Sequence, residues 1–347
     1  MIKPIALGKK RSIGPGHPPL VIAETCINHE GDVRIAKQMV HMAHAMGADC
    51  IKFQIHVLEN EMLRETPQSD NFNEPLWDTI DRTNLTLEEH IHLKKLCEEL
   101  GILYLCTPFS RKGTDLLEEI GVDFYKVGSG EMTNLPLIEY IARKGKPVIV
   151  STGMSEFDEV RETVNLVKDI GTPLVLTHCV SAYPCPYNIV NLGMIPKYRE
   201  ALQIPIGLSD HSRGIYTALG AVALGACIVE KHFTLDKMQK GPDHPSSIEP
   251  YELGELVKGA RAIFESMGSE RKIFVEERQI VAWARESVVS EVTIKSGTVI
   301  TPEMVWVKRP GPGPGVVPAK DLKKVVGKKV RVDIPKDTQI RWEHLES

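Results

Sequence analysis

The chain has 347 residues and a net charge of −4, from 42 Lys and Arg against 46 Asp and Glu. Hydrophobic residues make up 42% of it and charged residues 25%, as in globular proteins with a large core. The lack of excess positive charge argues against nucleic-acid binding, and the longest apolar run, 217–229, is too short for a membrane helix. The cysteines form no CxxC pair and the N-terminus lacks a signal-peptide core, so we expect reduced thiols in a cytoplasmic protein.

Short apolar runs alternate with amphipathic stretches through most of the chain. The runs predict eight strands, at 20–25, 50–54, 102–107, 123–128, 147–152, 173–179, 204–210 and 227–233. Helical spacing is seen in the stretches between and after them, for example 33–46, 86–100, 156–170 and 250–267. This order predicts an α/β fold, a (β/α)8 TIM barrel within residues 1–280. The polar stretch 56–85 is long for a barrel loop and predicts a lid or a partner contact.

A second, smaller domain is predicted for residues 281–347. Segment 292–305 matches segment 332–345 at a Val, an Ile, a Thr and a second Ile, which makes an internal repeat. Between the two copies, the proline-rich segment 308–319 excludes a helix or a central strand. We therefore expect a small β-rich domain with a pseudo-twofold axis, rather than a charged linker.

Polar groups gather at the predicted carboxyl ends of the strands, where TIM barrels carry their active sites. These groups are Glu24, Lys52, Gln54, Thr107, Lys126, Ser129, Ser151, Thr152, His178, Ser181, Ser209, Asp210, His211, Glu230, Lys231 and His232. Lys52 and Lys126 lie inside apolar runs, where an unpaired ammonium group is costly unless it meets an anion. Together with the hydroxyls they predict a site for a small phosphate or carboxylate. The alternative is a lysine at the rim that pairs with Glu24 or Glu131.

Two histidines end neighbouring strands of the predicted barrel. His211 and His232 would lie close together and leave open positions on a bound metal, as Lewis-acid catalysis requires. The alternative is a hydrogen-bonded or acid–base histidine, and two ligands do not fix the type of metal. The loop 241–244 brings Asp243 near the same edge, where it would meet a polyhydroxylated ligand, and Tyr183 would stack or hydrogen bond there.

Seven motifs occur in the same order as in a known family: AETCINHEGD (23–32), IKFQ (51–54), YKVGSGE (125–131), STGM (151–154), GLSDH (207–211), EKHFTLD (230–236) and GPDH (241–244). In these motifs the chain resembles the sialic acid synthases. Its tail, with the repeat and the Arg309-Pro310 loop, resembles their antifreeze-like SAF domain, a β-clip fold. The resemblance implies a transferase that condenses phosphoenolpyruvate with an N-acetylated amino sugar, giving a nine-carbon 2-keto sugar acid and phosphate.

The resemblance also implies roles for individual residues. Those that match phosphoenolpyruvate-binding positions are Lys52, Thr107, Lys126, Ser129, Ser151, Ser181 and Ser209. Those that match positions around the sugar and the reacting carbons are Glu24, Gln54, Glu131, Tyr183 and Asp243. His211 and His232 match ligands of a divalent metal, usually manganese, with magnesium or cobalt as alternatives. Arg309 matches an arginine that reaches the partner's barrel and touches the N-acetyl group, which implies a domain-swapped homodimer.

The chain departs from the family pattern in two motifs. Members often have AEIGVNH where this chain has Thr25 and Cys26 at the third and fourth positions, and we expect this change only to repack the first strand. Ser181 stands where some members have Asn, which changes one expected phosphate contact. The family reaction includes the addition of a water molecule. We expect this water to be oriented by the metal or by a carboxylate, either Glu131 or Glu24.

Two other functions are consistent with the sequence. One is another phosphoenolpyruvate-dependent synthase that uses a different aldose, and the other is a non-catalytic protein that binds carbohydrate or ice through its tail. The sequence also leaves the acceptor open. The candidates are N-acetylmannosamine, its 6-phosphate, and the diacetamido-dideoxy sugars that lead to legionaminic or pseudaminic acid.

Overall fold

The computed structural model describes residues 2–8, 11–67, 72 and 74–346. Its contacts divide the chain into two compact units, Met1–Gly268 and Ser269–Ser347. The boundary predicted at 280/281 falls inside helix α10 (Arg278–Ala284), which the contacts place in the second unit. Each unit is described by itself.

The first unit is built on eight parallel strands. Their bounds are β3 Leu20–Glu24, β4 Cys50–Ile55, β5 Leu103–Pro108, β6 Tyr125–Val127, β7 Val148–Ser151, β8 Leu174–Cys179, β9 Ile206–Asp210 and β10 Ile228–His232. The ladder runs β5-β4-β3-β10-β9-β8-β7-β6, and the end strands β5 and β6 lie side by side. The sheet thus curls into a nearly closed barrel, as predicted, and every strand agrees with its predicted range to within two residues.

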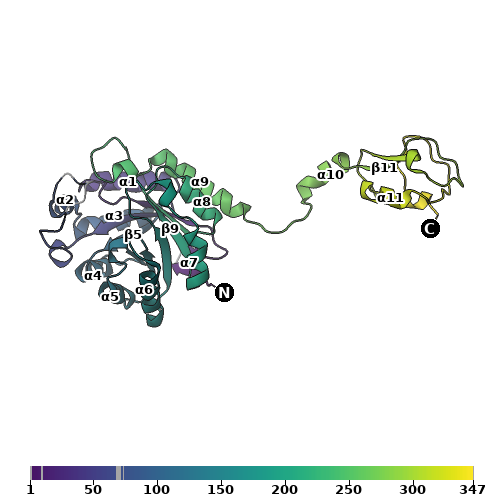
Figure 1. The fold of residues 1–347 in the computed structure, drawn as a ribbon. Coiled ribbons are helices and arrows are strands. Elements are labelled where there is room, and N and C mark those ends of the chain that lie inside the picture. Colours follow the sequence, from purple (N-terminus) through teal and green to yellow (C-terminus); the bar gives the residue numbers. More distant parts are fainter. Residues whose placement is uncertain (1, 9–10, 68–71, 73, 347) are drawn as a thin grey trace. The chain divides into compact units, whose positions relative to one another are not determined.

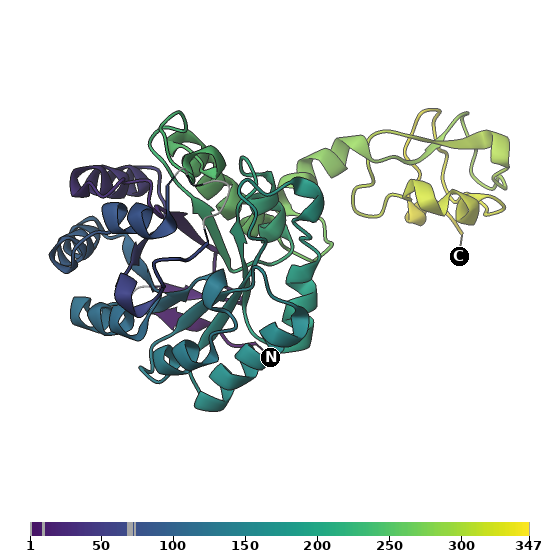
Figure 2. The same ribbon diagram turned by 60° about the vertical axis from the view of Figure 1, so that its left-hand side comes forward.

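Helices lie around the outside of the strands (Figure 1), and the turned view shows them following one another around the barrel (Figure 2). They are α1 Val33–Ala45, α2 Leu76–Thr83, α3 Leu87–Leu100, α4 Arg111–Ile120, α5 Leu135–Ala142, α6 Phe157–Ile170, α7 Met194–Leu202, α8 Tyr216–Ala223 and α9 Pro250–Ser266. A capping box of Thr86 and Glu89 begins α3, and Gly101 ends it in the left-handed conformation. Among the described residues, no helix has the length and apolarity needed to cross a membrane.

A short hairpin closes the amino-terminal end of the barrel. Strands β1 (Ile5–Leu7) and β2 (Arg11–Ile13) pair in antiparallel fashion. Leu7 and Ile13 are fully buried among side chains from the beginnings of the barrel strands, including Leu20. The sequence analysis did not predict this hairpin. It fills the lower end of the barrel, so that the carboxyl ends of the strands form the open end.

The second unit is a small β domain with a core of its own. It contains β11 (Ser287–Ser290), β12 (Val305–Lys308) and the short helix α11 (Leu322–Val325). Ile294 and Ile334 hold the same place in the two copies of the repeat, and they exchange both backbone hydrogen bonds at 2.8 Å. The copies therefore pair about a pseudo-twofold axis, which confirms the expectation from the sequence.

Candidate active site at the barrel mouth

A cavity of about 540 Å³ opens at the carboxyl ends of the barrel strands. It is lined by all fourteen barrel residues predicted for the site: Glu24, Lys52, Gln54, Thr107, Lys126, Ser129, Glu131, Ser151, Ser181, Tyr183, Ser209, His211, His232 and Asp243. They meet because β3 ends at Glu24, β7 at Ser151 and β10 at His232, all at one edge of the barrel. The fifteenth predicted residue, Arg309, lies in the second unit, with its guanidinium 5.5 Å from the ring centroid of Trp283.

Lys52 projects into the cavity from the middle of β4 and is buried between two carboxylates. Its Nζ lies 2.5 Å from Oε2 of Glu24 and 2.9 Å from Oε1 of Glu230. Burial lowers the pKa of Lys52 to about 8, against the opposing effect of Glu230. The lysine therefore forms a buried ion pair, and its ammonium group is held at the cavity wall.

Lys126, on β6, is only 1% exposed. Its Nζ donates to Oγ of Ser151 at 2.6 Å and to the carbonyl of Val127 at 2.9 Å, and it lies 3.9 Å from Glu230. Burial raises the pKa of Glu230, but the ammonium groups of Lys126 and Lys52 outweigh it and hold this pKa well below its usual range. Glu230 is thus the shared counter-ion of both lysines, a role that the sequence analysis did not assign.

The hydroxyl groups around the lysines include two without partners. Among the described residues, Oγ1 of Thr107 and Oγ of Ser181 are buried and make no hydrogen bond. Ser129 Oγ accepts a bond from the backbone N–H of Gly153 at 3.1 Å. Because buried polar atoms in folded proteins are nearly always bonded, the free hydroxyls indicate a place for the oxygens of a ligand.

The two candidate carboxylates have different environments. Glu131 ends a short 3-10 helix, Ser129–Glu131, and its Oε2 is buried without a partner among the described residues. Burial raises the pKa of Glu131 from 4.5 to about 7, with Lys126 opposing the rise. Glu24 instead pairs with Lys52 and accepts the N–H of Cys26 at 2.6 Å. Glu131 is therefore the carboxylate able to exchange a proton near neutral pH.

The predicted metal ligands lie on one side of the mouth. The rings of His211 and His232 are 5.1 Å apart, and the ring of Tyr183 is 4.1 Å from that of His211. His211 Nδ1 donates to the carbonyl of Val180 at 2.8 Å, which leaves Nε2 as the acceptor in the neutral ring. Nδ1 of His232 is buried without a hydrogen-bond partner among the described residues, and Oδ1 of Asp243 lies 3.7 Å away. Imidazole nitrogens beside a carboxylate are a donor set that fits a divalent metal.

The stretch 56–85 contributes to the wall of the cavity. Its residues 68–71 and 73 lie outside the described part of the chain. A chain of hydrogen bonds leads into it, because Gln54 Oε1 lies 3.1 Å from Nε2 of His56, whose Nδ1 lies 2.7 Å from Glu61. Beyond Glu61 the cavity is lined by four apolar side chains, those of Met62, Phe72, Leu76 and Ile80.

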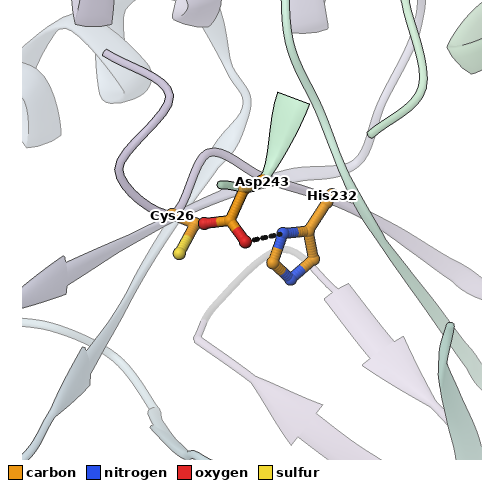
Figure 3. Close-up of side chains that lie close together, drawn as sticks. All are labelled: Cys26, His232 and Asp243. Carbon is orange, nitrogen blue, oxygen red and sulfur yellow. Dashed lines mark ion pairs between the residues drawn. The ribbon is translucent and has the colours of Figure 1, made fainter. Parts of the chain in front are cut away.

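Cys26 belongs to the site as well, although the sequence analysis gave it no role there. It follows β3 and lines the cavity, and its Sγ accepts a hydrogen bond from Nε2 of Gln54 at 3.2 Å. The thiol, the carboxylate of Asp243 and the ring of His232 offer ligand atoms that all lie within 4.8 Å of one another (Figure 3). The expectation that this position only repacks the first strand is therefore wrong. The signal in the sequence was a cysteine where family members often have glycine.

Comparisons with known proteins agree with the fold and show the family of the chain. A family model described as the NeuB family matches residues 39–272, and one described as the SAF domain matches residues 285–346. The chain is 37% identical over 344 residues to the N-acetylneuraminate-9-phosphate synthase of Homo sapiens, covering 97% of this chain and 95% of the other. It is 36% identical over 332 residues to the N,N'-diacetyllegionaminic acid synthase of Campylobacter jejuni, covering 93% and 98%.

A solved structure of a sialic acid synthetase is also similar to this chain. The crystal structure of N-acetylneuraminic acid (sialic acid) synthetase from Leptospira borgpetersenii matches with a TM-score of 0.72 and 34% identity. The match covers 81% of this chain and 96% of that one.

Proposed function

Because the chain belongs to the NeuB family and carries a SAF domain, we propose that it condenses phosphoenolpyruvate with an N-acetylated amino sugar. The products are a nine-carbon 2-keto sugar acid and phosphate, and a divalent metal takes part. The observation that carries the proposal is the floor of the cavity, where two buried lysines lie among hydroxyls, two of which lack partners among the described residues.

Phosphoenolpyruvate fits this floor by charge and by hydrogen bonding. Its phosphate and carboxylate would meet the ammonium groups of Lys52 and Lys126 and accept bonds from the surrounding hydroxyls of Thr107, Ser129, Ser151, Ser181 and Ser209. Glu230 keeps both ammonium groups in place before the anion arrives. The phosphate and the reacting carbons are thereby fixed in one position, which lowers the entropic part of the barrier.

The metal would be held by His211 and His232, with the carboxylate of Asp243 beside them. When bound, it would supply a Lewis acid that polarises the aldehyde of the open-chain sugar. Manganese is the ion that the family resemblance suggests.

The reaction needs a new carbon–carbon bond and then a water molecule. The π electrons of phosphoenolpyruvate form a bond from its C3 to the aldehyde carbon, whose oxygen takes up a proton. Water then adds at the electron-poor C2 and gives its proton to Glu131, which is suited to this by a pKa of about 7. The bond between C2 and the bridging oxygen breaks, and phosphate leaves with the electron pair and takes the proton of the C2 hydroxyl, so that C2 becomes the keto carbon. The proton accepted by Glu131 replaces the one taken up by the aldehyde oxygen. Glu24 keeps Lys52 in position throughout.

We propose further that the acceptor is not phosphorylated. The stretch 56–85 holds seven acidic residues and two arginines. Both arginines are engaged, since Arg64 lies 4.7 Å from the ring centroid of Trp77 and Arg82 pairs with Glu30 and Glu74. The apolar wall above the floor suits a deoxy position or an acetyl methyl group better than a second phosphate. N-acetylmannosamine and the diacetamido-dideoxy sugars therefore fit better than a 6-phosphate.

The test is release of phosphate from phosphoenolpyruvate with each candidate acceptor, in manganese and in EDTA. We expect release that requires both the metal and an unphosphorylated acetamido sugar. If the 6-phosphate is the best acceptor, the argument from the acidic stretch fails. If no acetamido sugar supports release, the synthase proposal fails.

The family resemblance also leads us to propose a homodimer in which Arg309 of one chain contacts the sugar in the barrel of its partner. Arg309 lies in the Gly/Pro-rich loop that follows β12. An arginine there would supply a hydrogen-bond donor to the N-acetyl carbonyl. We expect Arg309→Ala to raise the KM for the sugar more than the KM for phosphoenolpyruvate. An equal effect on both would contradict the sugar contact.

A further inference from the structure

We infer that Cys26 is a ligand of the divalent metal, together with His232 and Asp243, and that this chain therefore favours zinc or cobalt over magnesium and manganese. The three residues come from separate segments: the end of β3, the end of β10 and the loop before the 3-10 helix His244–Ser246. In Figure 3 the carboxylate of Asp243 lies between the thiol and the imidazole ring. The inference rests on the proposed function in one respect only, that a divalent metal binds at this mouth.

The distances suit one shared ion. The three ligand atoms lie within 4.8 Å of one another, and Nδ1 of His232 is 3.7 Å from Oδ1 of Asp243. Bonds from zinc to nitrogen, oxygen and sulfur are about 2.0–2.3 Å long, so ligand atoms around one ion are about 3–4.5 Å apart. Small side-chain rotations would bring all three atoms into that range.

His232 supplies independent support. The residue is 7% exposed, and its Nδ1 is buried without a hydrogen-bond partner in the described part of the chain. A buried nitrogen of this kind needs a partner, and Oδ1 of Asp243, at 3.7 Å, is too far away for a hydrogen bond. A metal ion would satisfy the nitrogen, the carboxylate and the thiol at once.

The backbone and the neighbour of Cys26 agree with a ligand role. Cys26 has φ of 45°, in the left-handed region that favours glycine, so a side chain here strains the backbone. Glycine, which family members often carry at this position, would be free of that strain. Gln54 donates from Nε2 to Sγ at 3.2 Å, and this bond holds the sulfur in position.

A thiolate changes which metals the site prefers. Carboxylate suits manganese and magnesium, and imidazole suits zinc, copper, iron and nickel, whereas a thiolate shifts the preference further toward softer ions such as zinc. As the metal–sulfur bond forms, the thiol proton passes to solvent. Cys26 would thus set the metal specificity of the site.

The test uses the purified full chain, freed of metal and titrated with Co²⁺ in the absence of substrates. A cobalt–thiolate bond gives a charge-transfer band in the near ultraviolet. We expect this band in the natural protein and in Cys185→Ser, a control that alters a buried cysteine outside the cavity lining. We expect no band in Cys26→Gly or Cys26→Ser, and affinities for Co²⁺ and Zn²⁺ lower by about tenfold or more. The affinity for Mn²⁺ should change less.

Cys26→Gly also guards against misfolding, because glycine accepts the left-handed backbone without strain. The inference is overturned if cobalt binds without the band, if Cys26→Gly keeps its cobalt affinity, or if the natural protein binds no cobalt. These outcomes are separate from those of the phosphate-release assay. That assay decides the synthase proposal, whichever metal the chain prefers.

Discussion

Oε1 of Glu230 lies 2.9 Å from Nζ of Lys52, and both side chains are buried in the floor of the cavity. The same oxygen accepts a hydrogen bond from Ser209 at 2.9 Å and lies 3.9 Å from Lys126. One carboxylate thus lies near both ammonium groups at the place where we propose that phosphoenolpyruvate binds.

Replacing this carboxylate should destabilise the ligand-free protein. Glu230→Gln leaves Lys126 without its buried counter-ion, while Lys52 keeps Glu24, and we expect the free energy of unfolding to fall by about 3 kcal/mol. Added phosphoenolpyruvate should recover part of the loss, because its anionic groups replace the missing charge. Urea denaturation with and without the ligand measures both effects.

The exposed ion pair of Lys295 and Asp333 provides the matched control. Asp333→Asn makes the same kind of change at the surface, and we expect no measurable effect. Equal effects of Glu230→Gln and Asp333→Asn would contradict the role of Glu230 as a buried counter-ion.

The pH dependence of turnover should report on Glu131. If its carboxylate accepts the proton of the attacking water, kcat/KM rises as the pH passes through about 7, the pKa of this group in the ligand-free protein. Glu131→Gln should lower kcat by about 100-fold and remove this limb of the profile. A mutant that kept the limb would shift the assignment away from Glu131.

Glu131 should also affect the free energy of unfolding, and the direction of its pKa shift fixes the sign of the effect. The folded state raises the pKa of Glu131 from 4.5 to about 7, so it favours the protonated form. This contribution is complete below pH 4.5 and is lost as the pH rises through about 7. Glu131→Gln, which cannot ionise, should therefore be more stable than the natural protein at pH 8, by up to about 3 kcal/mol. Urea midpoints at pH 5 and pH 8 test this, and a difference that does not grow with pH would contradict it.

Metal removal should stop turnover. We expect EDTA to abolish phosphate release, and His211→Ala to do the same while the circular dichroism spectrum stays unchanged. The matched substitution His92→Ala alters a histidine of α3 outside the cavity lining and should leave activity intact. Full activity in EDTA would argue against any catalytic metal.

Mixing two impaired variants tests the domain-swapped dimer, with activity measured at a sugar concentration at which Arg309→Ala, because of its raised KM, shows little turnover. Lys126→Ala removes a barrel residue and Arg309→Ala removes the loop arginine. In a swapped dimer a mixed pair contains one intact site, so refolding the two variants together should restore about a quarter of the natural activity. If each barrel used the Arg309 of its own chain, the mixture would stay as inactive as its components.

The strands and most of the site residues could be predicted because a β/α alternation fixes both. Once the strands are placed, their carboxyl ends define the mouth, and fourteen predicted residues do line one cavity. The ion pairs that those residues form could not be predicted from the sequence. In β10, Glu230 faces the lysines of the cavity while its neighbour Lys231 pairs with Asp210 at 3.2 Å. Sequence reasoning took both as strand-end polar groups, because the partners come from other strands.

The hairpin of β1 and β2 was missed for a different reason. Each of its strands has three residues, too few to show a period. The role of Cys26 was missed because a single changed residue forms no pattern along the sequence. Its meaning depends on Asp243, more than 200 positions later in the chain, reaching the same edge of the barrel.

Ile294 and Ile334 each donate a backbone hydrogen bond to the other. Two identical chains form the same pattern of bonds across a twofold axis. The hydrogen bond from the N–H of Gly297 to the carbonyl of Val330 has its counterpart from Asp337 to Ser290. The donor lies forty positions later in the chain and the acceptor forty positions earlier. Each copy of the repeat thus completes the other, as the halves of a homodimer would. A peptide that contains one copy would leave its pairing edge open and should associate with a second peptide of the same kind.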